Sequence, residues 1–182
     1  MAGTTAICAL EGARLKIVLS QKNQDADLFI KDFISTAASE CQIFLDAPLS
    51  LPIKYLTGEG TDYFYRKADK EMKAMSPMFL GGLTARAIQL KDWLEASDHQ
   101  VLEAYPAAAA KRLSLENLDY KKKEGDIDIV SAVILTELGL ELKTKLKTWH
   151  EVDALIAYWI GIQYLNGNCK TAGDPQEGLI HY

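Results

Sequence analysis

Short apolar runs of strand length alternate with longer amphipathic segments along the chain. Residues 4–10 (TTAICAL) and 15–19 (LKIVL) are short and apolar, and the glycine-containing turn between them predicts an antiparallel hairpin. Two further apolar runs, at residues 41–45 (CQIFL) and 100–104 (QVLEA), are each followed by a proline that stops a strand. These four runs are the predicted strands.

Helical periodicity fills most of the intervals between the strands. Asp25 is a suitable N-cap for a helix that extends to about Glu40, and residues 83–96 form an amphipathic pattern with Ile88, Leu90 and Trp93 inward. The alternation favours a mixed sheet flanked by helices, in a single α/β domain over residues 1–182. Further helices are predicted at 106–113, 127–147 (weakened by Gly139) and 150–165, a partial helix at 63–75, and loops at 48–62 and after 166.

Composition limits the classes of protein to which the chain can belong. Its 182 residues, 48% of them hydrophobic, suit one domain that buries roughly 70% of its unfolded surface. Cys8, Cys41 and Cys169 lack the spacing of a disulfide framework or a zinc site, so we expect a reducing cytoplasm. No run is long and apolar enough to predict a membrane span. The net charge of −5 counts mildly against a nucleic-acid partner, but a bound metal ion would cancel carboxylate charge.

Two of the predicted strands end in the same way, with an acid, a small residue and then a proline. Asp46 ends one (FLDAP) and Glu103 the other (LEAYP), and ligands collect at the carboxyl ends of strands in α/β sheets. Asp153 lies near the start of the last helix, on the same face as His150. Three hard oxygen ligands beside an imidazole suit Mg²⁺ or Mn²⁺ better than zinc. We therefore expect Asp46, Glu103 and Asp153 to form one metal site.

Structural roles also explain each of these residues taken alone. Asp46 can bond the amides of its own turn, Asp153 can interact with the dipole of its helix, and His150 can cap that helix. The metal site is therefore a hypothesis about the three acids together.

Basic and aromatic side chains supply candidates for binding a substrate. Tyr63, Phe64 and Tyr65 precede Arg66, and such aromatics either stack on nucleobases or pack within a lid. The candidates for phosphate contact are Arg66, Arg86, Lys121 and Lys122.

Seven segments, taken in order, resemble one known family. Together they are similar to domain-of-unknown-function family 429, which is regarded as a family of predicted nucleases of ribonuclease-H-like fold, related to Holliday-junction resolvases. The segments are FLDAPLSLP (44–52), YRKADKEM (65–72), LTARAIQL (83–90), LEAYPAA (102–108), YKKKEG (120–125), HEVDALIAYW (150–159) and GDPQEGLI (173–180).

The resemblance implies a ribonuclease-H-like mixed sheet and an acidic centre. Members of that family open with a strand carrying Gly-Ile-Asp, whereas residues 4–10 and 15–19 resemble the second and third strands. We therefore expect the first, central strand to be missing, Met1 to be an internal methionine, and the chain to be inactive or weakly active. The resemblance further implies that Asp46, Glu103 and Asp153 form the centre and that Arg66, Lys121, His150 and Glu177 line or support it.

Three functions are compatible with the sequence. The first is a metal-dependent nuclease that uses Mg²⁺ or Mn²⁺ to hydrolyse phosphodiester bonds. The second is a non-catalytic ribonuclease-H-like binding module, favoured by the negative charge and the missing first acid. The third, which ranks last, is hydrolysis without a metal by Asp46 and Glu103 acting as acid and base.

Overall fold

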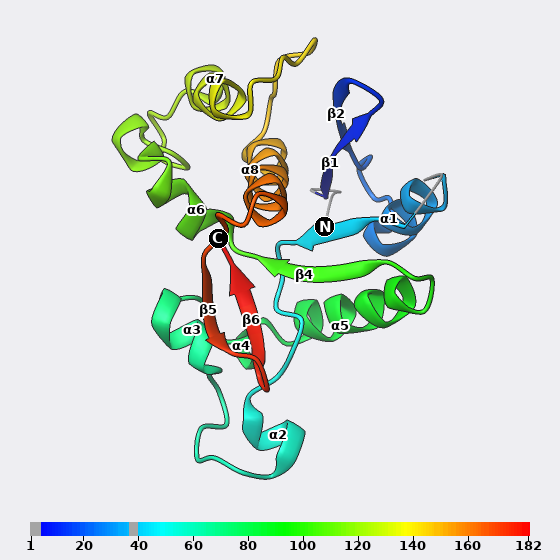
Figure 1. Cartoon of the computed structure of the whole chain (residues 1–182), viewed down its shortest axis with the longest axis vertical. Helices are drawn as coiled ribbons and strands as arrows, with labels where there is room; N and C mark the ends of the chain where they lie inside the picture. The colour runs from blue at the N-terminus through cyan, green and yellow to red at the C-terminus, as the bar shows by residue number, and fades with distance from the viewer. Residues whose placement is uncertain (1–4, 37–39) are drawn as a thin grey trace.

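A four-stranded mixed sheet and a separate two-stranded hairpin form the β-structure of the protein (Figure 1). The computed structural model describes residues 5–36 and 40–182. The strands are β1 (Ala6–Glu11), β2 (Arg14–Leu19), β3 (Gln42–Leu45), β4 (Gln100–Ala104), β5 (Thr171–Asp174) and β6 (Gly178–His181). The helices are α1 (Ala26–Ser35), α2 (Ile53–Thr57), α3 (Lys67–Met72), α4 (Pro77–Leu80), α5 (Gly82–Glu95), α6 (Pro106–Arg112), the 3-10 helix η1 (Leu115–Leu118), α7 (Ile127–Leu138) and α8 (Trp149–Leu165).

The larger sheet has the strand order β3-β4-β6-β5. Strands β3, β4 and β6 run parallel, and only β5 is antiparallel to its neighbour β6. Leu45 pairs with Glu103, which in turn pairs with Ile180. The expected mixed sheet is confirmed, and its register brings the carboxyl ends of β3 and β4 to one edge of the sheet.

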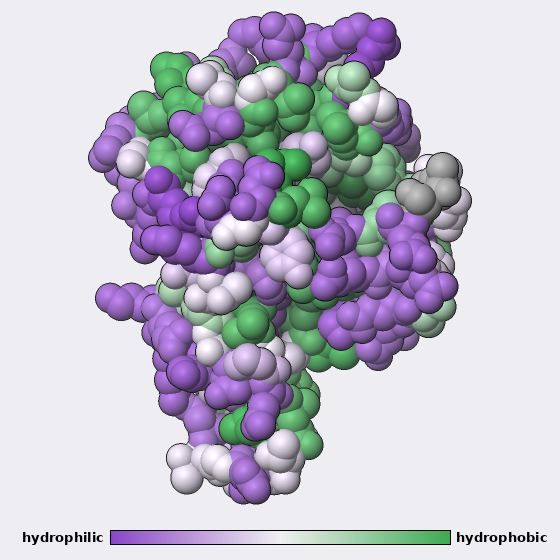
Figure 2. Space-filling model, viewed as in Figure 1, coloured by the Kyte–Doolittle hydropathy of each residue, from purple (hydrophilic) through white to green (hydrophobic). Residues whose placement is uncertain are grey.

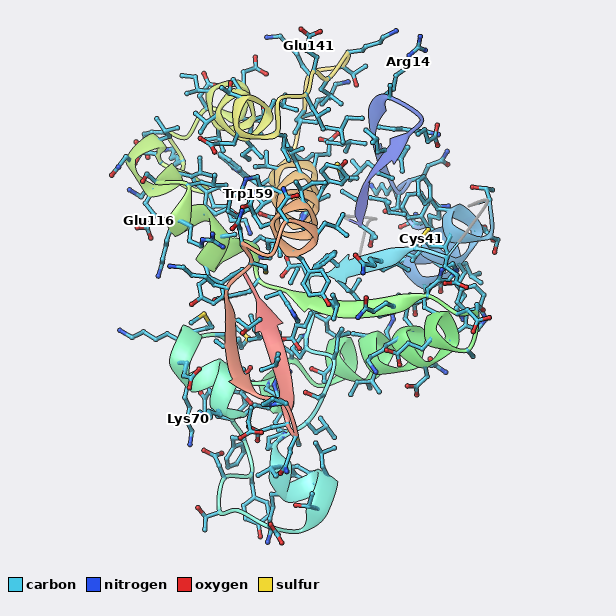
Figure 3. The ribbon with its side chains drawn as sticks, viewed as in Figure 1. Arg14, Cys41, Lys70, Glu116, Glu141 and Trp159 are labelled. Carbon is cyan, nitrogen blue, oxygen red and sulfur yellow. The ribbon has the colours of Figure 1, made fainter. Side chains whose placement is uncertain are left out.

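Helix α8 is the central element of the fold. It packs against both strands of the hairpin, against β3, and against helices α6 and α7. Val152, Leu155, Ile156 and Ile160 are fully buried in this core, and Trp159 lies on the same helix at the centre of the molecule (Figure 3). Within the described residues, no helix has the length and hydropathy needed to cross a bilayer.

A second, smaller core lies between α5 and the sheet. Ala87, Leu90 and Leu94 of α5 pack there with Leu49 and Val101. Of the three residues expected to face inward, Leu90 is buried, whereas Ile88 and Trp93 are only half-buried. Trp93 instead packs under the ammonium group of Lys31, 4.9 Å from its ring centre.

Several predicted boundaries are wrong. The predicted helix at 127–147 ends at Leu138, because Gly139 adopts a left-handed conformation (φ 64°) that terminates it. The predicted loop at 48–62 contains α2, and the predicted C-terminal loop contains β5 and β6. The first helix ends at Ser35, and residues 37–39 of its predicted range lie outside the described residues.

Residues 49–78 leave the sheet after β3 and return at α4. They carry α2 and α3, and in Figure 2 the α2 end forms a narrow lobe that projects below the main body. This excursion contributes Arg66, Asp69, Ala74 and Met75 to the wall of the cavity described next.

Candidate functional site

Asp46 follows directly after β3, at the carboxyl edge of the sheet. It borders a cavity of about 280 Å³, and within the described residues no hydrogen bond reaches its carboxylate. As a residue Asp46 is exposed to solvent, but the surrounding protein removes much of the hydration of its carboxyl group. This desolvation, together with the nearby charge of Asp153, raises the pKa of Asp46 to about 7. The remaining cavity walls include Ala47, Pro48, Ala74, Met75, Leu80, Leu83, Tyr105 and Ile180.

Asp153 of α8 is buried, and its charge acts on Asp46. Its carboxylate accepts a hydrogen bond from the hydroxyl of Tyr120, and the ammonium group of Lys121 lies 2.6 Å from its other oxygen. Burial and the charge of Asp153 raise the pKa of Tyr120, so this hydroxyl keeps its proton and acts as a donor. Two neighbouring residues of one loop therefore hold Asp153 in place.

Glu103 lies on β4, and a buried arginine contacts both oxygens of its carboxylate. Arg66 makes two parallel contacts to it, Nη1–Oε2 at 2.6 Å and Nη2–Oε1 at 2.7 Å, and a further 2.7 Å contact to Asp69. The backbone N–H of Leu49 also donates to Glu103, at 2.9 Å. Burial lowers the pKa of Arg66, but the bonds to Glu103 and Asp69 outweigh it and hold the pKa above its usual value. Arg66, Asp69 and Glu103 form a charged triad, and all three residues line the cavity.

Glu177 is buried in the turn between β5 and β6. Its two carboxylate oxygens accept hydrogen bonds from the backbone N–H groups of Ile53 and Lys67, both at 2.6 Å. Ile53 is the first residue of α2 and Lys67 the first of α3. One carboxylate therefore caps two helices of the excursion and closes the C-terminal turn against it.

The remaining predicted site residues lie elsewhere. His150 is exposed at the second position of α8, and the N-cap of that helix is Thr148 rather than His150. Arg86 forms a 2.9 Å ion pair with Asp27 that joins α5 to α1. The structure thus brings together Asp46, Glu103, Asp153 and Lys121, because the charges of the last three all influence Asp46.

A family model described as "Protein of unknown function (DUF429)" matches residues 2–178. The chain belongs to this family. The comparisons with curated proteins and with solved structures found no match.

For this DUF429 chain, the three acids do not form a complete metal cage. Within residues 5–36 and 40–182, no group of three or more His, Cys, Asp or Glu side chains is arranged to hold a metal ion. Glu103 is the reason, because both of its oxygens already contact Arg66. Asp46 and Asp153 remain as a like-charged pair, and Mg²⁺ is usually bound by one or two carboxylates together with water and substrate phosphate. Asp46 and Asp153 are therefore the residues that could hold a divalent cation, whereas Glu103 is taken up by Arg66.

Tyr120, Tyr105 and Asp69 contribute to the site of this DUF429 protein but were not predicted. The charge of Asp46 contributes to raising the pKa of Tyr105 after burial, which places that ring beside the carboxylate. Asp69 had a signal in the sequence, because an acid three residues after the N-cap can accept a hydrogen bond from the backbone N–H of that residue, as Asp69 does from Arg66 at 2.8 Å. Tyr120 precedes Lys121, but nothing in its sequence context distinguishes it from a packed aromatic.

Proposed function

We propose that this DUF429 protein is a metal-dependent phosphodiesterase that acts on nucleic acid. The observation that carries the proposal is the position of Asp46, which follows directly after β3, lines the cavity and lies close enough to Asp153 for the charge of that acid to raise its pKa. Two acids that repel each other are relieved by a shared cation, and divalent cations are the usual partners of such pairs in phosphoryl transfer.

In this proposal some side chains bind the metal ion and others hold those ligands in position. Asp46 and Asp153 would hold Mg²⁺ or Mn²⁺, which when bound activates water and neutralises charge on a phosphate. Lys121, which pairs with Asp153, would exchange that contact for a phosphate oxygen, and the hydrogen bond from Tyr120 would keep the Asp153 carboxylate in its orientation. Glu103 and Arg66 keep the end of β4 in position through their buried contacts.

We further propose that the sheet is of the ribonuclease-H-like kind. Within the described residues, the hairpin β1–β2 is not hydrogen-bonded to the sheet β3-β4-β6-β5, yet both pack on α8. This arrangement of an antiparallel hairpin and a mixed sheet on one central helix supports the proposal.

A cleavage assay tests the proposed activity. Labelled single-stranded DNA, branched DNA and RNA are incubated with the protein and Mn²⁺, beside the variants Asp46→Asn and Asp92→Asn. Asp92 is an exposed aspartate of α5 and serves as the matched control. We expect cleavage that EDTA and Asp46→Asn abolish and that Asp92→Asn leaves unchanged; equal cleavage by the wild type and Asp46→Asn would end this proposal.

The second candidate is a non-catalytic binding module. Its support is that two of the three acids are already paired, Glu103 with Arg66 and Asp153 with Lys121. This function predicts no stabilisation by divalent cations. A rise in melting temperature on adding Mn²⁺, absent in Asp46→Asn, would argue against it, because a ligand that binds the folded state stabilises that state.

A further inference from the structure

An apolar surface continues outward from the cavity that holds Asp46. We call the exposed side chains Phe64, Phe79, Met75 and Leu83 the aromatic rim; their exposed fractions are 52%, 64%, 61% and 48%. Met75 and Leu83 also line the cavity, so the rim and the candidate site share a wall. Large apolar side chains gathered at the mouth of a cavity usually mark a binding surface.

The aromatic side chains of the rim are held in place before any ligand arrives. The rings of Phe64 and Phe79 lie 5.7 Å apart at 31°, and Tyr65 meets Phe79 edge-on at 6.0 Å. Ser76, the N-cap of α4, donates a hydrogen bond to the carbonyl of Phe64 and thereby ties together the two segments that carry the rings. Because the rings are already ordered, a ligand that stacks on them binds without a large entropic cost for fixing these side chains.

Cationic side chains accompany these rings. Asp62 accepts hydrogen bonds from the N–H groups of Phe64 and Tyr65, both at 2.8 Å, and also pairs with Lys70 at 2.5 Å. Lys70 lies on the outer side of α3, as Figure 3 shows. Lys67 of the same helix is also largely exposed and forms a long ion pair with Glu71, at 4.0 Å. Rings beside lysines form the combination that binds bases and phosphates of a single strand.

We propose that the aromatic rim binds the unpaired bases of a single-stranded segment and so leads the adjacent phosphodiester to Asp46. The bases stack on Phe79 and Phe64, and the lysines of α3 contact the phosphates. A duplex keeps its base faces stacked internally and cannot offer them to the rim. This inference rests on the proposed function, since it assigns that site a single-stranded substrate class.

Binding without cleavage tests this assignment. Fluorescence anisotropy follows a labelled oligothymidylate, and separately a labelled duplex, with the protein in EDTA. We expect tighter binding of the single strand, weakened about five- to one hundred-fold by Phe79→Ala and retained by Phe79→Trp. Ile129→Ala is the matched control, because Ile129 is 53% exposed on α7, away from the rim.

The outcomes separate the two proposals. Absence of oligothymidylate binding, full affinity in Phe79→Ala, or full affinity in Phe79→Leu overturns the stacking assignment. Light scattering that shows a wild-type dimer converted to a monomer by Phe79→Ala also overturns it, since the rim is then a contact between copies. Because EDTA prevents metal-dependent cleavage, a positive binding result stands even where Asp46→Asn cleaves as well as the wild type, and in that case only the proposed catalysis fails.

Discussion

The ionisation of Asp46 depends on its position rather than on any hydrogen bond. Although Asp46 is an exposed residue, the loss of hydration of its carboxyl group and the charge of Asp153 raise its pKa from 3.8 to about 7, and Lys121 offsets only part of that rise. The folded protein therefore binds a proton at Asp46 over a range of pH in which the unfolded chain has already lost it. This difference links the candidate site to stability.

We predict that Asp46→Asn changes how stability depends on pH. Between about pH 4 and 7 the folded wild type holds more protons than the unfolded chain, so its free energy of unfolding falls as the pH rises. The amide removes this loss, so the variant should be more stable than the wild type at pH 8, by about 1 kcal/mol after allowance for solvent screening. Urea unfolding at pH 4.5 and pH 8 measures this, with Asp92→Asn as the control; parallel curves for Asp46→Asn and the wild type would contradict it.

We also predict the effect of removing the charged group of Arg66. Its side chain is fully buried between Asp69 and Glu103, so Arg66→Met leaves two buried carboxylates without a counter-charge. We expect a loss of about 3–5 kcal/mol in the free energy of unfolding. Arg86→Met, which breaks only the exposed pair with Asp27, should cost less than about 1 kcal/mol. Chemical denaturation measures the free energy of unfolding of both variants. Equal losses would contradict the prediction that the buried triad stabilises the fold more than the exposed pair does.

For Arg66, the sequence did not predict which group the side chain contacts. Its position after three aromatic residues predicted a phosphate contact, but the side chain points inward to Glu103. An ammonium or guanidinium group has the same chemistry wherever it lies, and only the tertiary fold decides which acid it meets. Asp46 and Asp153 were predicted because their places, the end of a buried strand and the start of a long helix, are local features. Their use as metal ligands stays a prediction.

Glu177 connects elements that are distant in the sequence. Its carboxylate caps α2 and α3 from the turn between β5 and β6. The same turn approaches the excursion so closely that a Cβ on Gly178, whose φ is 110°, would lie 2.4 Å from the hydroxyl of Ser50. A negative charge at the start of two helices also interacts favourably with their dipoles.

We predict that Glu177→Ala loosens α2 and α3 within the excursion of residues 49–78. Two hydrogen bonds to a buried carboxylate disappear and two N–H groups lose their acceptor, which should cost about 2–4 kcal/mol. Hydrogen exchange should rise in α2 and α3 before it rises in α8. Gln176→Ala, one residue earlier and exposed, should leave both helices unchanged; protection of α2 and α3 that survives in Glu177→Ala would refute the capping role.

The sequence predicts helices and strands that have strong local patterns, and it misses strands that lack such patterns. The strand at Gln100–Ala104 was placed to the residue, because an apolar run ends at a proline. The strands at Thr171–Asp174 and Gly178–His181 were missed: both are short, and they contain glycines that sheets usually exclude. They form because β6 pairs with β4, a contact between residues far apart in the chain. No local pattern carries that information.

The whole molecule depends on α8 as the element common to both sheets. Within the described part of the chain, the hairpin and the larger sheet share no ladder of hydrogen bonds. Each instead packs on α8, and one core cluster includes Leu15 of β2, Ala104 of β4 and Leu155 of α8. The hairpin is therefore held to the fold by side-chain packing alone, which makes its stability a direct measure of the α8 core.

We predict that Leu155→Ala destabilises the hairpin and the sheet together. The side chain is fully buried, so its truncation should cost about 2–5 kcal/mol, and exchange protection should fall in β1 and β4 alike. Leu28→Ala, at a 59% exposed position of α1, should change stability by less than about 0.5 kcal/mol. Exchange measured by mass spectrometry resolves the two sheets. If β1 kept its protection while β4 lost it, the hairpin would have a support other than α8, and the central role of α8 would be refuted.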